Sequence, residues 1–225
     1  MATLSIKECL SFAWATFKSR PWIFVQAGLL LFLVNIAVNL VQTMLESGSE
    51  SNTGALVFVF GALSIIIGMA VSFLVSMGET AFFLRAHDAT ADVRIKDLWH
   101  PQPFWKFVGT SLLAGIIILL GFVLLIVPGI IAGIMLMFVG YLVIEEKLGP
   151  IDALKKSAAL TKGNRWKLFQ LALLALGLNI LGFLALLVGL FVSVPVSFLM
   201  TVHAYRTLSG RKEIAEEPSV LEAVA

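Results

Sequence analysis

Four long stretches of the sequence contain no charged residue, and this absence constrains the fold more than any other feature. The stretches are residues 21–45, 51–78, 107–144 and 168–205, more than half of the 225 residues. A bilayer crossing needs only about 20 apolar residues. Charged residues make up 13% of the chain, against about 25% in soluble domains. The sequence therefore predicts an all-α, polytopic membrane protein.

The lengths of these stretches predict six transmembrane helices. The last two stretches have 38 residues each, and a single helix of that length would measure about 57 Å, nearly twice the hydrocarbon thickness. Each must therefore fold back, at Pro128 in one and between Gly189 and Pro195 in the other. The helices are expected near residues 22–44, 55–77, 107–127, 128–144, 166–188 and 190–208. They form one membrane domain, residues 1–208, before a flexible cytoplasmic tail, residues 209–225.

The distribution of basic residues predicts the orientation. Cytoplasmic segments next to transmembrane helices carry an excess of Lys and Arg. With six crossings, all 16 Lys and Arg residues fall on one side, together with both termini, whereas the opposite side carries Glu46 and Glu50. An odd number of crossings would scatter the basic residues over both sides. We therefore expect both termini in the cytoplasm.

Each predicted pair of transmembrane helices follows a segment of similar character. These segments begin at Ile6, Ile95 and Ile151, and they lead into Trp22, Trp105 and Trp166. The first has apolar residues at helical spacing, which is typical of a helix lying in the membrane interface. The second and third units align without a gap at an offset that pairs Gly121 with Gly182. The sequence thus predicts an internal repeat of three hairpins, each preceded by a cytoplasmic amphipathic helix, with shared interfacial anchoring as the alternative explanation.

Composition and motifs argue against several function classes. A lone Cys9 excludes a disulfide framework, and so apolar a chain is not a nucleic-acid-binding domain. His87, His100 and His203 lack a metal-binding spacing, and neither a nucleophile elbow nor a phosphate-binding glycine loop is present. We therefore expect a protein that is not an enzyme and that has no metal, no cofactor and no nucleic-acid partner.

Polar residues within the predicted helices are the candidates for an intramembrane site. Asn35 and Asn39 share one face of the first helix, and Asn179 has a similar depth in the fifth. Buried amides either bond across a helix seam or line a polar site, and the sequence leaves both readings open. Glu79 is the acid nearest to a helix centre. Intramembrane acids are functional candidates, but we expect Glu79 to form a structural ion pair with a cytoplasmic Arg or Lys.

Basic residues at the predicted helix ends are candidates for contacts to lipid head groups. A Lys or Arg near the membrane surface attracts anionic lipids by about 1 kcal/mol. The candidates are Lys18, Arg20, Lys106, Arg165 and Lys167. Membrane lipids are therefore the expected partners, together with a protein partner or a second copy of the chain.

Several segments of the second half carry a family pattern. They are Val127-Pro128-Gly129-Ile130-Ile131, Tyr141-Leu142-Val143-Ile144-Glu145-Glu146, Gly149-Pro150-Ile151-Asp152-Ala153-Leu154 and Gly163-Asn164-Arg165-Trp166. Over about residues 90–208, the sequence resembles the YciC-like family of uncharacterised six-helix prokaryotic membrane proteins, which is related to the membrane domain of some glycerophosphodiester phosphodiesterases. The resemblance implies a bacterial or archaeal cytoplasmic (inner) membrane and a lipid or envelope role, and it supplies no catalytic residue.

These observations favour a non-catalytic integral membrane protein that acts as a lipid-associated or envelope-related scaffold. The alternative is a small transporter or channel with a polar path between the hairpins, lined by Asn35, Asn39 and Asn179. The alternative requires these amides to face one another around a wet cavity.

Overall fold

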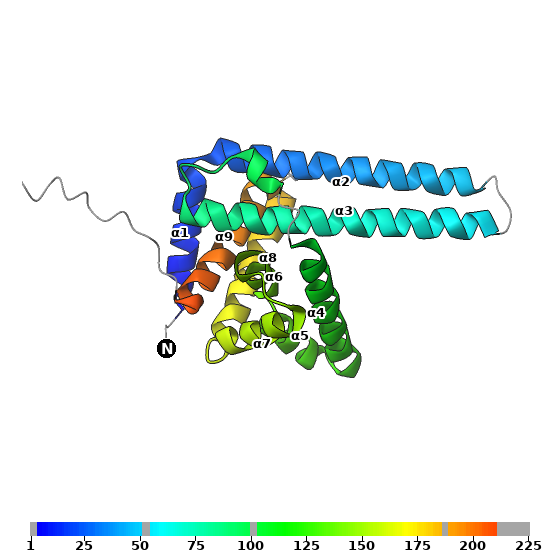
Figure 1. Ribbon diagram of the computed structural model, residues 1–225. Helices are drawn as coiled ribbons and strands as arrows, with labels where there is room; N and C mark the ends of the chain where they lie inside the picture. Colours follow the sequence, from blue (N-terminus) through cyan, green and yellow to red (C-terminus); the bar gives the residue numbers. More distant parts are fainter. Residues whose placement is uncertain (1–3, 51–54, 100–102, 186–188, 211–225) are drawn as a thin grey trace, which may run out of the picture.

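The computed structural model of the chain is built from helices in the residues that it describes, which are 4–50, 55–99, 103–185 and 189–210 (Figure 1). Its elements are α1 (Ile6–Ser19), α2 (Pro21–Glu50), α3 (Ala55–Asp88), the 3-10 helix η1 (Ile95–Leu98), α4 (Phe104–Leu124), α5 (Ile126–Met135), α6 (Val139–Glu146), α7 (Pro150–Thr161), α8 (Arg165–Leu184) and α9 (Leu190–Ser209). No strand occurs in this described part. The predicted all-α class is therefore confirmed.

The first helix, α1, is amphipathic. It begins after Ser5, whose hydroxyl accepts a hydrogen bond from the Glu8 amide at 3.4 Å. Its apolar face buries Cys9, Ala13 and Phe17. This face packs mainly against α9, so the first and last helices of the chain are neighbours (Figure 1).

The other two predicted surface segments differ from each other. The third is the helix α7, which has Pro150 at its first turn, as the sequence predicted. The second forms only a four-residue 3-10 helix, η1, within its described residues. Arg94 and Asp97 form a local capping arrangement that stabilises this short turn. The three-unit repeat and its surface helices therefore stay a prediction.

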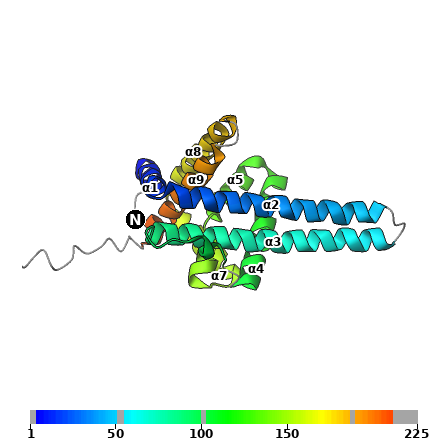
Figure 2. The same cartoon turned by 90° about the horizontal axis from the view of Figure 1, so that it is seen from above.

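The longest elements, α2 and α3, pack along each other and extend away from the rest of the protein (Figures 1 and 2). α3 has 34 residues, or about 51 Å at 1.5 Å per residue, which exceeds the hydrocarbon thickness of about 30 Å. It continues past the expected end at residue 77 because Phe82, Phe83 and Ala86 are buried against other helices. The first charge after a charge-free stretch therefore does not mark the end of the helix.

The return between α4 and α5 lies slightly earlier than expected. α4 ends at Leu124, Leu125 is extended, and α5 begins at Ile126. Pro128 thus lies within the first turn of α5, where proline is tolerated because the first N–H groups of a helix have no intrahelical partner. Pro195 likewise lies in α9, close to its start.

Close contacts between glycines join α4 to α5 and α8 to α9. A Cβ atom on Gly121 would lie 2.9 Å from the Cα of Gly129, and one on Gly182 would lie 3.0 Å from the backbone of Gly189. A side chain at either position would push the helices apart. Gly121 and Gly182 are also the pair that the sequence offset aligns, whereas the same offset places Gly129 one residue away from Gly189, opposite Leu190.

The helix predicted near residues 128–144 is interrupted. α5 ends at Met135 and α6 begins at Val139. Ser157 of α7 satisfies the backbone at this break. Its hydroxyl donates to the Met135 carbonyl at 2.7 Å and accepts from the Phe138 N–H at 3.3 Å. Because this partner comes from a later helix, the break has no local sequence signal.

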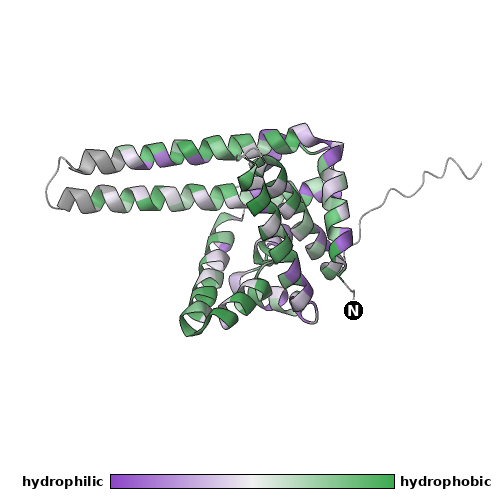
Figure 3. Ribbon diagram, turned by 180° about the vertical axis from the view of Figure 1, so that it is seen from behind, coloured by the Kyte–Doolittle hydropathy of each residue, from purple (hydrophilic) through white to green (hydrophobic). Residues whose placement is uncertain are grey.

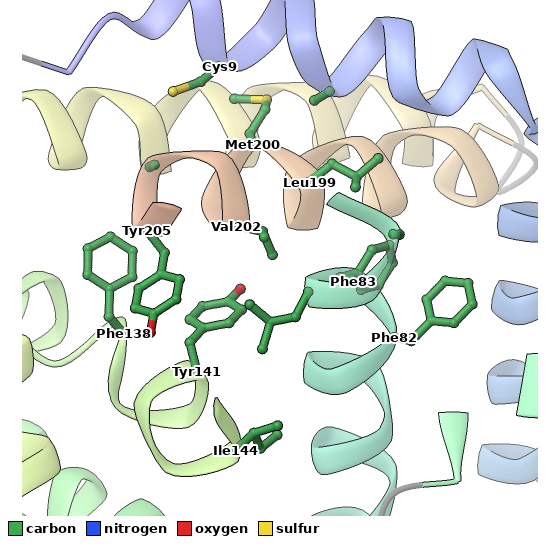
Figure 4. Packing of buried hydrophobic residues seen from close by; sticks show 14 of the residues in the cluster. Cys9, Phe82, Phe83, Phe138, Tyr141, Ile144, Leu199, Met200, Val202 and Tyr205 are labelled. Atoms are coloured by element: carbon green, nitrogen blue, oxygen red, sulfur yellow. The ribbon is translucent and has the colours of Figure 1, made fainter. Parts of the chain in front are cut away.

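The core lies where α1, α3, α6 and α9 meet. The ring centroids of Tyr141 and Tyr205 are 5.3 Å apart, and Phe138 lies 5.6 Å from Tyr205 (Figure 4). Leu142 and Val202 are fully buried beside these rings. Apolar packing therefore holds together the start of the chain, the ends of α3 and α9, and α6.

Large apolar side chains are exposed along the outer parts of the helices. Val123, Leu124 and Leu125 are each at least 70% exposed. Figure 3 shows hydrophobic residues predominating along α2, α3, α4 and α5. A protein in water would not stably expose so continuous an apolar surface, whereas lipid solvates it.

Five segments in the described part are long and apolar enough to cross a membrane. They are Pro21–Met44, Gly61–Asp88, Phe104–Leu124, Ile126–Glu146 and Arg165–Leu184. The chain is therefore a multi-pass membrane protein. α9, the sixth expected span, is not among the five; half of its 20 residues are buried by protein, and it carries several polar side chains. The predicted tail, residues 209–225, lies almost entirely outside the described residues.

Candidate functional site

Asn35 and Glu79 line a cavity between α2, α3 and α9. The cavity has a volume of about 260 Å³. Its remaining lining is apolar: Phe24, Ala27, Gly28, Leu31, Phe32, Phe83, Leu190, Phe191, Val194, Pro195 and Phe198. We refer to it as the Glu79 cavity. It brings together two of the four intramembrane residues that the sequence singled out.

A second cavity, of about 230 Å³, lies between α2 and α3 and shares these two residues. Its lining is more polar, because Ser72 and Ser76 contribute hydroxyl groups. The Asn35 amide donates to the Leu31 carbonyl of its own helix at 3.0 Å. Asn35 and Glu79 therefore lie at the junction of an apolar and a more polar space.

The expected ion pair of Glu79 is absent from the described part of the chain. Arg85, the nearest base on the same helix, pairs instead with Asp97 of η1, with 2.8 Å between Nη1 and Oδ1. Within the described residues, the Glu79 carboxylate has no hydrogen bond or ion pair. Glu79 thus contributes an uncompensated acidic group to its cavity.

The other two amides are located elsewhere. Asn39 is exposed on α2 and donates to the Asn35 carbonyl at 2.8 Å. Asn179 lies on α8, and its Oδ1 is buried with no hydrogen-bond partner among residues 4–50, 55–99, 103–185 and 189–210. Neither residue is part of the lining of the two cavities that Asn35 and Glu79 share.

An ionic network around the buried Arg206 joins the ends of α3, α6 and α9; its Asp88 side chain is 47% exposed. Arg206, 7% exposed, forms ion pairs with Asp88 of α3 and Glu145 of α6. The Tyr205 hydroxyl donates to Glu145 at 2.6 Å. Buried charges are stable only when they are paired and hydrogen-bonded. The network therefore serves as a structural connection between the three helices.

Two histidines extend this network. His87 Nδ1 lies 3.1 Å from Asp88, and His87 Nε2 lies 3.1 Å from His203 Nδ1. The ring of Phe12 from α1 is stacked on His203, with 4.4 Å between centroids. Sequence reasoning did not bring these two histidines together, because they are far apart along the chain; it named only His203, with Glu79, as a candidate of the least favoured hypothesis, an intramembrane enzyme. The sequence indicated only that the Tyr205-Arg206 pair and an acidic residue occur at helix ends, and that these ends are expected on the same side of the membrane.

Three of the basic residues that were expected to contact lipid head groups interact with other groups of the protein. Arg20 donates to the carbonyls of Thr90 and Ala91, and Lys106 donates to the Lys147 carbonyl at 2.7 Å. Lys18 lies over the Trp14 ring at 5.2 Å. These three cations therefore already have partners within the protein.

Arg165 has a different environment. It lines a slot between α5 and α8 that has a volume of about 330 Å³. We call it the α5–α8 slot; it is lined by Val127, Ile130, Ile131, Ile134, Arg165, Trp166 and Phe169. Arg165 is the single charged residue of this lining, and its Nε is buried without a hydrogen-bond partner in the part of the chain that the structure describes. Lys167 follows it at the start of α8, half-buried. The slot thus combines an apolar wall with one cationic group.

The described residues contain no cluster of His, Cys, Asp and Glu able to hold a metal ion. The side chains that line the two candidate sites supply charge, hydrogen bonding and apolar contact. The Glu79 cavity presents a carboxylate and an amide. The α5–α8 slot presents a guanidinium.

Comparisons with known proteins give relatives of unknown function. The chain is 29% identical over 118 residues to the uncharacterized protein Rv2560 of Mycobacterium tuberculosis and to the uncharacterized protein Mb2590 of Mycobacterium bovis. The match covers 52% of this chain and 36% of each relative, so the chain spans about a third of their length. No solved structure matches the chain.

Membership of an uncharacterised family is confirmed, whereas the YciC-like name and the relation to glycerophosphodiester phosphodiesterases stay predictions. A family model described as "Protein of unknown function (DUF975)" matches residues 16–212. This match includes every transmembrane candidate and both candidate sites. The chain therefore belongs to the DUF975 family of proteins of unknown function.

Proposed function

We propose that this protein is a non-catalytic membrane scaffold of the prokaryotic cytoplasmic membrane that binds an anionic phospholipid in the α5–α8 slot. The observation that carries the proposal is the position of Arg165. Its Nε is buried and has no hydrogen-bond partner among the described residues, and it is the single charge among apolar lining residues. A buried donor without a partner costs about 1–3 kcal/mol, which a ligand phosphate would recover.

The shape and composition of the slot fit a phospholipid. A guanidinium binds phosphate through two parallel hydrogen bonds. Ile130, Ile131 and Ile134 provide an apolar wall for an acyl chain, at about 25 cal/mol for each Å² removed from water. Trp166 is 68% exposed at the start of α8, and tryptophan is enriched where a membrane meets water.

The proposal includes six crossings, arranged as three hairpins, with both termini in the cytoplasm. α9 is the sixth span in this arrangement, because a helix buried largely by protein needs less hydropathy than one facing lipid. The contacts of Arg206 with Asp88 and Glu145 support it, since they bring together the ends of α3, α6 and α9 that should share one side.

A transporter with an amide-lined path is less well supported. That mechanism needs Asn35, Asn39 and Asn179 around one cavity. Asn35 lines the Glu79 cavity, whereas Asn39 and Asn179 do not. We therefore keep the lipid-associated scaffold as the proposed function.

The test is native mass spectrometry of the protein released from nanodiscs that contain equal amounts of phosphatidylglycerol and phosphatidylcholine. We expect the unaltered protein to retain phosphatidylglycerol preferentially, and Arg165→Gln to lose this preference. Lys162→Gln is the matched control, because Lys162 is exposed three residues away and does not line the slot. Equal retention of phosphatidylglycerol by both variants would refute the site.

A second variant tests the slot without changing charge. Ile131→Trp should fill the apolar part and displace the lipid, whereas Ile117→Trp on α4, outside the slot, should leave retention unchanged. If Ile131→Trp also retains the lipid, the head group binds without the slot and the proposed site is wrong.

A further inference from the structure

We propose that the Glu79 cavity binds a small organic cation, namely a quaternary or protonated amine that carries an apolar group. This inference is independent of the α5–α8 slot, because the two sites share no lining residue. It assigns a ligand class to the cavity between α2, α3 and α9. Three observations support it: the aromatic lining, the charge of Glu79, and the volume of the cavity.

The first observation is the aromatic lining of the cavity. Phe83 is stacked on Phe198 with 4.7 Å between ring centroids, and Phe24 lies 6.3 Å from Phe83 in a parallel orientation. Phe32 and Phe191 meet edge to face at 6.3 Å. These rings come from α2, α3 and α9, so three helices contribute aromatic groups to one space. Phenylalanine faces attract cations, and aromatic groups are the usual recognition surface for quaternary ammonium ions.

The second observation is the charge balance of the lining. Glu79 is the single charged residue among those that line the cavity, and Asn35 is the single amide. Within the described residues, no cation of the protein pairs with the Glu79 carboxylate, because Arg85 pairs with Asp97. On the side of the Glu79 cavity the carboxylate meets apolar groups, and an anionic group there is stabilised by a compensating charge. A ligand cation would supply that charge.

The volume of the cavity, together with its few polar groups, excludes other classes of ligand. An anion would be repelled by Glu79, and a purely apolar molecule would leave the carboxylate without a partner. A hard divalent cation requires about six oxygen ligands, whereas the lining offers one carboxylate and one amide. A volume of about 260 Å³ suits a molecule the size of one benzyl group and one trimethylammonium group. The apolar group would contact the phenylalanines, and the cationic nitrogen would face Glu79.

The experiment measures binding of benzyltrimethylammonium to the purified protein in phosphatidylcholine nanodiscs, by saturation-transfer NMR with empty nanodiscs as the blank. The uncharged probe neopentylbenzene has the same shape and carbon in place of nitrogen. We expect saturable binding of the cation alone, and Glu79→Gln should weaken it by at least about tenfold. Glu8→Gln is the matched control, because it removes the same charge from an exposed position on α1.

Each outcome decides the proposal. Saturable cation binding that Glu79→Gln weakens at least about tenfold and Glu8→Gln preserves supports it. Equal binding by Glu79→Gln and the unaltered protein, equal binding of the neutral probe, or no saturable binding by the unaltered protein overturns it. If Glu79→Gln does not fold, Val194→Trp replaces it as the decisive variant. That change fills the cavity while the carboxylate stays, and unchanged cation affinity in Val194→Trp would also overturn the proposal.

Discussion

His87 on α3 and His203 on α9 lie with Nε2 and Nδ1 only 3.1 Å apart, although 116 positions separate them in the sequence. One nitrogen of this contact must donate and the other accept. Phe12 of α1 lies against both rings, at 4.5 Å and 4.4 Å between centroids. The contact therefore unites the first helix, the last helix and the end of α3 beside the ionic network of Arg206.

The ionic network should dominate the stability of this region. Replacing Arg206 by Met would leave the Asp88 and Glu145 carboxylates without their shared cation. We expect the free energy of unfolding to fall by about 1–3 kcal/mol, because the mostly buried Glu145 carboxylate would lose its cation, whereas water can solvate the half-exposed Asp88 carboxylate. The measurement is denaturant unfolding in detergent micelles.

Arg85→Met serves as the control for this prediction. Arg85 also pairs with an acid, Asp97, but its side chain is 57% exposed. Exposed pairs contribute about 0–1 kcal/mol. If both substitutions destabilise the protein equally, burial of the Arg206 network has no special role.

Because α8 and α9 are in close contact at Gly182, we expect alanine to lower the free energy of unfolding at Gly182 but not at Gly177. In Gly182→Ala the new methyl group would meet Ser193 and the backbone of Gly189, and overpacking should cost about 1–3 kcal/mol of unfolding free energy. In Gly177→Ala on the same helix, no atom lies within 4 Å of the new Cβ. This control should be neutral or stabilising by up to about 1 kcal/mol. Equal stability of the two variants would contradict the close helix contact.

Ser157 should be required for the break between α5 and α6. Ser157→Ala would remove the partner of the Met135 carbonyl and the Phe138 N–H, and unsatisfied buried backbone groups cost about 1–3 kcal/mol. Ser11→Ala, on the exposed face of α1, should change the free energy of unfolding by less than about 0.5 kcal/mol. Thermal unfolding of the two variants under one condition tests this difference, and a smaller effect at Ser157 would refute it.

The thiol of Cys9 predicts a pH dependence. Burial, with a smaller contribution from the Glu8 carboxylate, raises the pKa of the Cys9 thiol from 9.0 to about 11. The folded state therefore holds this proton more tightly than the unfolded state. The resulting stabilisation is complete below pH 9 and is lost as the pH rises towards 11. Between these values, the free energy of unfolding should fall more steeply in the unaltered protein than in Cys9→Ala; parallel pH profiles would disprove the shift.

Local sequence patterns predicted the positions of the helices better than they predicted the contacts between helices. The charge-free stretches located the helical regions, and the expected start of the last helix at residue 190 agrees with α9. The interruption after Met135 escaped prediction, because its cause is a hydroxyl on α7. Likewise, no sequence pattern indicated that Arg206 would bridge Asp88 and Glu145. Such pairings depend on how distant helices pack, which is not encoded in local periodicity.

The candidate site was predictable only in part. The rarity of acids inside apolar stretches drew attention to Glu79, and polar spacing did the same for Asn35. The structure places both on one cavity. The phenylalanines that complete its lining were indistinguishable in sequence from lipid-facing residues. Equal depth in the membrane, the argument that grouped Asn179 with Asn35, says nothing about which helices are adjacent.

The packing of α1 against α9 has a consequence for biosynthesis. α1 leaves the ribosome well before α9, so Cys9 and Phe17 remain without their main partner helix while the intervening helices are synthesised. The acids at positions 88 and 145 likewise await a cation that is synthesised some 60 residues or more after them. These contacts therefore form only after α9 has been synthesised.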